Sequence, residues 1–69
     1  MNITNREKDV LHAIELFTFK HRYAPSVRDI ADALGWSSSS TAHGYLQRLK
    51  KKGYISWEPD RPRTLKVIK

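Results

Sequence analysis

The feature that most restricts the fold of this chain is a pair of helical apolar patterns separated by a few residues around Gly35. In both segments apolar residues recur at intervals of three and four, as they do along one face of a helix. They are Val27, Ile30, Ala31 and Leu34 before the glycine, and Ala42, Tyr45, Leu46 and Leu49 after it. A glycine just past the last apolar position is a common left-handed helix end. The pattern therefore predicts two helices, over about 27–34 and 39–52, joined by a tight turn.

A longer helix is predicted at the N-terminal end, from Asn5 to about Lys20. Thr4 and Glu7 fit a capping box, in which each side chain accepts a hydrogen bond from the backbone amide of the other residue. Apolar residues then recur at helical spacing. These are Val10, Leu11, Ile14 and Phe17. The first helix should therefore turn one apolar face toward a core shared with the other two.

Serines and a second glycine set the limits of the two later helices. Ser26 follows Pro25, which disfavours helix before it, and is the expected N-cap of the helix over 27–34. One of the serines from Ser37 to Ser39 is expected to cap the helix over 39–52, because its hydroxyl can accept a hydrogen bond from a first-turn amide. Gly53 should end that helix.

Two short β-prone runs, YISW and TLKVI, follow and are separated by the turn-rich EPDRPR. They predict a two-stranded antiparallel hairpin over about 54–68. The order helix, helix, tight turn, helix, hairpin is that of a winged helix-turn-helix, mostly α with a small β wing. A chain of 69 residues without cysteine supports one apolar core and no disulfide. We therefore expect a single domain over 1–69.

The net charge of +6 is confined to the second half of the chain. Residues 1–34 contain five basic and five acidic side chains, whereas residues 35–69 contain eight basic and two acidic ones. A solvated basic surface could have this composition. A basic half beside a neutral half is, however, typical of a protein that binds nucleic acid.

The helix over 39–52 has a polar side opposite its apolar stripe, and this side suits contact with DNA bases. Its short donors and acceptors are Ser40, Thr41, His43 and Gln47. Gly44 lies in the middle of the same side, where glycine costs about 1 kcal/mol relative to alanine. Close approach of the helix to a DNA groove would explain that cost. In the hairpin, Arg61 and Arg63 flank a proline in a stiff loop and could contact phosphates or the minor groove.

No combination of residues predicts an enzyme, a metal site or a cofactor. His43 has no second histidine four positions away, and no serine lies in a G-x-S-x-G motif. No signal peptide or apolar run of membrane-spanning length is present. We therefore expect a cytoplasmic, non-enzymatic protein without a cofactor.

The segment YAPSVRDIADALGWSSSSTAHGYLQRLKKKGYI, together with RPRTLKVI, resembles the N-terminal DNA-binding domain of the LexA repressor family, most closely its Gram-positive, DinR-like branch. The likeness runs from Thr4 to Ile68, and SSSTAHGYL is its most specific part. The resemblance implies a winged helix-turn-helix that binds a palindromic SOS-box operator in two copies and represses transcription. It also implies a CGAAC-type half-site, and a place at the bacterial nucleoid or, for a phage-encoded protein, in the host cytoplasm.

The residue pattern and the resemblance together define the expected DNA contacts. The base-reading residues are Ser38, Ser39, Ser40, Thr41, His43, Gly44 and Gln47. The residues expected at the DNA backbone or in the wing are Arg6, Ser26, Arg28, Lys50, Lys52, Arg61 and Arg63. Among them, the assignments of Ser38, Arg6 and Lys52 rest on the resemblance.

Departures from the family pattern leave other functions open. The family's full-length repressors continue into a self-cleaving protease domain, so this chain is either an excised domain or a stand-alone regulator from a phage or plasmid. In the second case Leu16, Phe17 and Phe19 could contact a protein partner such as a resident repressor. Arg22 replaces a frequent loop glycine, so the turn after the first helix could differ. A sequence-independent nucleic-acid binder is a third alternative.

Overall fold

The computed structural model describes residues 3–61 and 63–68. The elements follow in the order α1 (Asn5–His21), α2 (Val27–Ala33), α3 (Ser39–Lys51), β1 (Ile55–Ser56) and β2 (Lys66–Val67). The strands pair antiparallel, with Ile55 opposite Val67 and Ser56 opposite Lys66. The expected winged helix-turn-helix is thus confirmed, although each strand has only two residues. None of the helices in the described ranges is long and apolar enough to cross a membrane.

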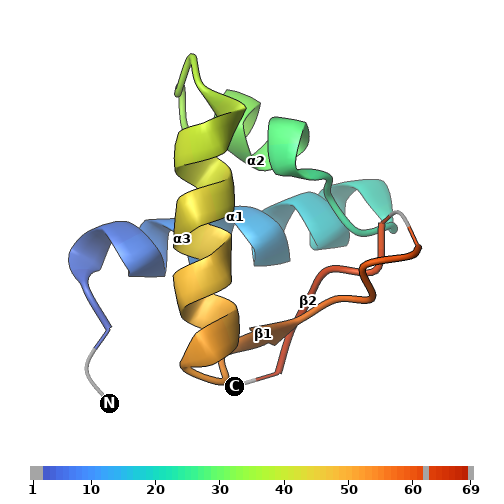
Figure 1. Cartoon of the computed structure of the whole chain (residues 1–69). Helices are drawn as coiled ribbons and strands as arrows, with labels where there is room; N and C mark the ends of the chain where they lie inside the picture. Colours follow the sequence, from blue (N-terminus) through green and yellow to red (C-terminus); the bar gives the residue numbers. More distant parts are fainter. Residues whose placement is uncertain (1–2, 62, 69) are drawn as a thin grey trace.

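The three helices and the hairpin surround one apolar core. In Figure 1, α3 crosses in front of α1. Helix α2 lies behind the upper end of α3, and the hairpin extends from the lower end of α3. Every element contributes to the core, and α1 packs against both other helices and β2. The buried apolar residues are Val10, Ala13, Ile14, Ile30, Ala31, Ala42, Leu46, Leu49, Ile55 and Leu65. Burial of one side of α3 in this core leaves its opposite side on the surface.

The predicted capping box of Thr4 and Glu7 and the predicted N-cap at Ser26 are confirmed, and Ser26 also forms a capping box with Asp29. The Glu7 amide donates to Thr4 Oγ1 at 3.1 Å, and the Thr4 amide donates to Glu7 Oε1 at 2.9 Å. At the start of α2, the Asp29 amide donates to Ser26 Oγ at 3.1 Å and the Ser26 amide to Asp29 Oδ2 at 3.0 Å. The start of α3 differs, because Ser38 is the N-cap but its side chain makes no capping hydrogen bond. The expected hydroxyl cap is therefore wrong there, and the extended backbone of Ser38 (φ −112°, ψ 121°) starts the helix without it.

Glycines end α2 and α3 as the sequence predicts. Gly35 and Gly53 have φ of 73° and 83°, in the left-handed region. After Gly35, the Trp36 amide donates to the Ala31 carbonyl at 2.8 Å. This is the 6→1 hydrogen bond of a Schellman motif. This bond fixes the backbone at Trp36 in the turn that leads into α3.

Arg22 is the C-cap of α1 and adopts φ 66° and ψ 19° although it is not a glycine. A left-handed backbone costs a residue with a Cβ about 1–2 kcal/mol. We expect Arg22→Gly to raise the free energy of unfolding by about 0.5–1 kcal/mol, because relief of this strain outweighs the larger unfolded-state entropy of glycine. Thermal and urea denaturation would measure the change. Arg22→Ala is the control, since alanine keeps the strain, and equal stability of the two variants would contradict the prediction.

Candidate nucleic-acid interface

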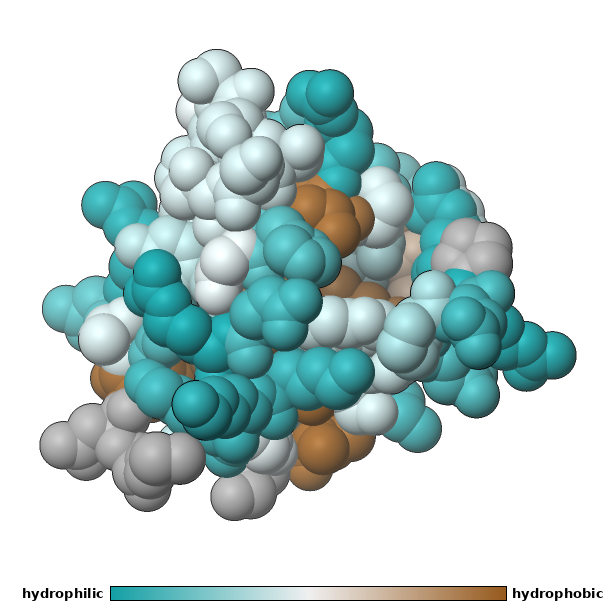
Figure 2. All heavy atoms as spheres, viewed as in Figure 1, coloured by the Kyte–Doolittle hydropathy of each residue, from teal (hydrophilic) through white to brown (hydrophobic). Residues whose placement is uncertain are grey.

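The predicted base-reading residues lie on the surface side of α3. Ala42, Leu46 and Leu49 are at most 2% exposed and turn the other side of the helix into the core. The exposed members are Ser38, Ser40, Thr41, His43 and Gln47, while Ser39 and Gly44 are half-buried. In Figure 2, weakly polar atoms gather where α3 begins, and strongly hydrophilic atoms cover its lower part and the wing. The structure therefore places the predicted readers together on one side of a single helix.

Gly44 is not required by packing within the domain. A Cβ built on it would meet no atom within 4 Å, and its φ does not lie in the left-handed region. Alanine would fit this position and would favour the helix. The glycine therefore has no explanation in the described contacts of the free protein.

Two of the reader side chains contact each other. Gln47 Nε2 lies 3.0 Å from His43 Nε2, one helical turn away. With the amide as donor, the ring nitrogen accepts, and the remaining ring N–H of His43 is on Nδ1. The pair then presents the Nδ1–H of His43 as a donor and the Oε1 of Gln47 as an acceptor, in a defined relative orientation.

Lys52 does not extend freely from the end of α3. Its Nζ donates to Glu7 Oε1 at 2.8 Å, and Glu7 is only 1% exposed. The Lys52 ammonium and the Thr4 amide hold the pKa of Glu7 below its ordinary 4.5, although burial acts in the opposite direction. This ion pair joins the start of α1 to the end of α3, and so brings the helix that carries Arg6 close to the end of α3.

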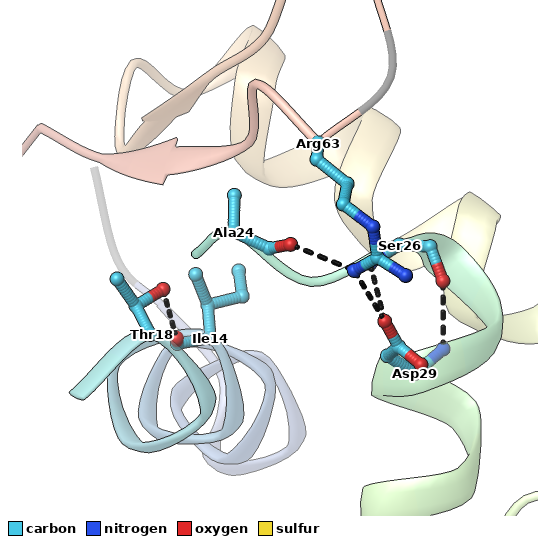
Figure 3. Close-up of polar contacts among 6 residues, drawn as sticks. All are labelled: Ile14, Thr18, Ala24, Ser26, Asp29 and Arg63. Atoms are coloured by element: carbon cyan, nitrogen blue, oxygen red, sulfur yellow. Dashed lines mark hydrogen bonds and ion pairs between the residues drawn. The ribbon is translucent and has the colours of Figure 1, made fainter. Parts of the chain in front are cut away.

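Arg63 connects the wing to the start of α2. Its Nη1 donates to the Ala24 carbonyl at 3.1 Å and to Asp29 Oδ2 at 3.0 Å (Figure 3). Its guanidinium also lies 4.8 Å from the centroid of the Tyr23 ring. The Ser26 amide and then the Arg63 guanidinium lower the pKa of Asp29, against the effect of burial. The sequence predicts a DNA-backbone contact for Arg63 and does not predict these internal contacts. They fix the wing relative to the helix-turn-helix.

A groove of about 400 Å³ separates the wing from α2 and α3. Four predicted site residues line it, namely Ser26, His43, Arg61 and Arg63. Arg28 is exposed on α2, and Arg6 is exposed in the first turn of α1. Arg61 forms a long, solvent-exposed ion pair with Glu58, at 3.8 Å. The structure thus brings the wing arginines beside the reading side of α3, while Arg6 lies on a different helix.

The family called LexA DNA binding domain matches residues 1–64. This chain belongs to that family. The LexA repressor of Bacillus mycoides (strain KBAB4) is 46% identical to it over 66 residues, which cover 96% of the chain and 32% of that protein. The LexA repressor of Bacillus anthracis matches with the same identity and coverage. The chain therefore spans about a third of the length of these LexA repressors.

The three apolar residues of α1 that the sequence suggests for a protein contact in this LexA-family chain differ in exposure. Leu16 and Phe19 are 66% and 76% exposed, whereas Phe17 is half-buried and lies 4.2 Å from the His21 ring, centroid to centroid. Of the three residues expected to contact a protein partner, two are therefore exposed and one is half-buried.

In residues 3–61 and 63–68, no group of three His, Cys, Asp or Glu side chains could hold a metal.

Sequence reasoning missed the aromatic partners of two basic residues on α3. Lys50 Nζ lies 4.3 Å from the Trp57 ring centroid, and Arg48 Cζ lies 4.6 Å from that of Tyr45. Tyr45 in turn packs on Trp36, with ring centroids 5.3 Å apart. The position of Arg48 on the polar side of α3 was the sequence signal that could have identified it as a candidate DNA contact. Its partner Tyr45 lies on the half-buried flank of α3, and the partner of Lys50, Trp57, lies after β1.

Proposed function

We propose that this domain binds double-stranded DNA with α3 in the major groove and the wing beside the backbone, and that it acts as a LexA-like repressor on an inverted-repeat operator of the SOS-box type. The observation that supports this most is the surface side of α3, where hydroxyl, imidazole and amide groups surround Gly44. An α-helix with side chains is about 10–12 Å wide, which matches the width of the major groove. Membership of the LexA DNA-binding domain family supports the same function.

The readers have distinct roles in this proposal. Ser40, His43 and Gln47 contact base edges, since hydroxyl, imidazole and amide groups provide both donors and acceptors there. Thr41 contributes a hydroxyl and a methyl group, and the latter suits contact with a thymine methyl. Ser38 and Ser39, at the start of α3, contact bases or the adjacent phosphates.

The basic residues fix the position of the helix on the duplex. Arg28, Lys50 and Arg61 are exposed and can donate to phosphates. Arg6 approaches the backbone from the start of α1. Lys52 and Arg63 are held by carboxylates, so in this proposal they orient the helix and the wing beside the DNA backbone.

A gel-shift titration tests the proposal with three duplexes: a palindrome of CGAAC-type half-sites, a single half-site and a scrambled sequence. We expect the palindrome to bind most tightly, with two copies per duplex. His43→Ala should weaken binding to the palindrome by about 1–3 kcal/mol and reduce discrimination at one base pair, because a base contact is lost.

Lys8→Gln on α1 is the control, since it removes an exposed charge without touching α3. Equal affinity of the wild-type domain for palindrome and scrambled DNA would contradict specific recognition and favour a sequence-independent binder. Failure to bind any duplex would favour the second candidate, a regulator that contacts a protein through the exposed Leu16 and Phe19.

A further inference from the structure

Two basic side chains of α3 are each held against an aromatic ring. Arg48 Cζ lies 4.6 Å from the Tyr45 ring centroid, and Lys50 Nζ lies 4.3 Å from that of Trp57. Both distances are within the range of a cation–π interaction. Each cation therefore has a preferred position on the surface of the domain.

The two cations lie on opposite flanks of the reading side. Residues 48 and 50 are two positions apart, which is about 200° around a helix measured over the core side and so about 160° measured over the exposed side. Gly44 and Gln47 fall in the sector between them. The exposed face of α3 is thus bordered by a guanidinium on one flank and an ammonium on the other.

Each aromatic partner is anchored by a different part of the fold. Trp57 directly follows β1, so Lys50 lies on the wing side of α3. Tyr45 packs on Trp36, whose amide is bound to the Ala31 carbonyl at 2.8 Å in the turn between α2 and α3. Arg48 is therefore held on the side of that turn, away from the wing.

Arg48 and Lys50 differ from Lys52, Arg61 and Arg63 in their ionic partners. Lys52, Arg61 and Arg63 each form an ion pair with a carboxylate. Within the described ranges, Arg48 and Lys50 form none, and both are exposed. Their charge is available to a ligand. A guanidinium stacked by its face on a ring keeps its N–H edges free, and these edges can donate two parallel hydrogen bonds to a phosphate.

We propose that Arg48 is a phosphate-binding residue and that, with Lys50, it forms a two-cation clasp that contacts the phosphates of both strands bordering the major groove. Tyr45 and Trp36 are positioning residues for the guanidinium. This inference rests on the proposed entry of α3 into DNA, and it assigns a contact on the flank of α3 opposite the wing.

The test measures the dependence of DNA affinity on salt for Arg48→Gln, Tyr45→Leu and the remote control Lys20→Gln. Each phosphate contact contributes about 0.9 to the slope of log affinity against log salt, so Arg48→Gln should lower the slope by about 1.8 for two copies on a palindrome. Its affinity at low salt should fall about tenfold or more, as for loss of a charge-assisted hydrogen bond.

Tyr45→Leu keeps the charge of Arg48 and removes the ring on which it stacks, so DNA affinity should fall about threefold with an unchanged salt slope. Lys20→Gln should leave the slope unchanged.

A wild-type slope and affinity in Arg48→Gln would overturn the clasp. Circular dichroism melts of each variant show whether the domain is folded under the binding conditions. The same series on scrambled DNA separates this inference from the operator proposal, because phosphate contacts do not depend on sequence. If the wild-type domain fails to prefer the palindrome, the operator proposal fails, while a lower slope for Arg48→Gln on scrambled DNA still supports the clasp.

Discussion

Replacing Lys52 with methionine should lower the free energy of unfolding by about 3 kcal/mol, because it leaves the Glu7 carboxylate buried without its ionic partner. Glu7 is 1% exposed, and its Oε1 accepts from Lys52 Nζ at 2.8 Å and from the Thr4 amide at 2.9 Å. Methionine keeps the apolar length of the lysine side chain, so the variant mainly removes the charge. Urea denaturation at neutral pH would measure the loss.

Two controls distinguish a buried pair from a general effect of charge. Arg61→Met removes the exposed pair with Glu58 and should change stability by less than about 0.5 kcal/mol. The double variant Glu7→Gln with Lys52→Met should recover part of the loss, since no buried charge remains. A loss below about 1 kcal/mol for Lys52→Met alone would show that Glu7 obtains enough stabilisation from Thr4 and from its own capping box.

The same pair makes stability depend on pH. The pKa of Glu7 in the folded protein is lowered from 4.5 and that of Asp29 from 3.8, so the folded state binds protons less readily than the unfolded chain. Both contributions are fully present above pH 4.5 and are lost as the pH falls through the lowered pKa values. Lys52→Met removes the largest cause of the Glu7 shift, so its stability should vary less with pH in this acidic range.

Local signals in the sequence predicted most of the fold. The two capping boxes depend on residues three positions apart, and the left-handed glycines depend on the end of one apolar stripe, so both could be found without tertiary information. The helix limits differ from the predicted ones by one residue at their C-terminal ends. The left-handed Arg22 shows that a non-glycine residue can occupy such an end where the fold requires the turn.

Long-range contacts explain what the sequence did not predict about the site. Arg63 and Asp29 are 34 positions apart, and Lys52 and Glu7 are 45 apart, so no spacing rule connects them. These pairs change the roles expected for Arg63 and Lys52, since each side chain is already held by a carboxylate. The pairing of Lys50 with Trp57 likewise depends on how the wing returns along α3. Charge counting identifies such residues as cations, but only the fold shows which of them keep their charge available.

Substituting Gly44 with alanine should have opposite effects on stability and on DNA binding. In the free domain the new Cβ meets no atom within 4 Å, and alanine is about 1 kcal/mol more favourable than glycine inside a helix. The free energy of unfolding should therefore rise by about 1 kcal/mol. In the proposed complex with DNA, α3 approaches the groove most closely at Gly44, so the added methyl group should cost about 1–3 kcal/mol through overpacking. We expect affinity for the palindrome to fall at least about fivefold.

A size series makes the interpretation of Gly44 sharper. Gly44→Leu, also a good helix former, should remain folded and bind DNA more weakly than Gly44→Ala, because the obstruction grows with side-chain size. Gly53→Ala is the matched control for a glycine at the end of α3. Because Gly53 has a φ of 83°, any Cβ is unfavourable there, and this substitution should lower stability where Gly44→Ala raises it. Full affinity in the stabilised Gly44→Ala variant would show that this side of α3 does not approach DNA closely. In that case the helix would have to bind through its N-terminal serines and its flanking cations rather than through its centre.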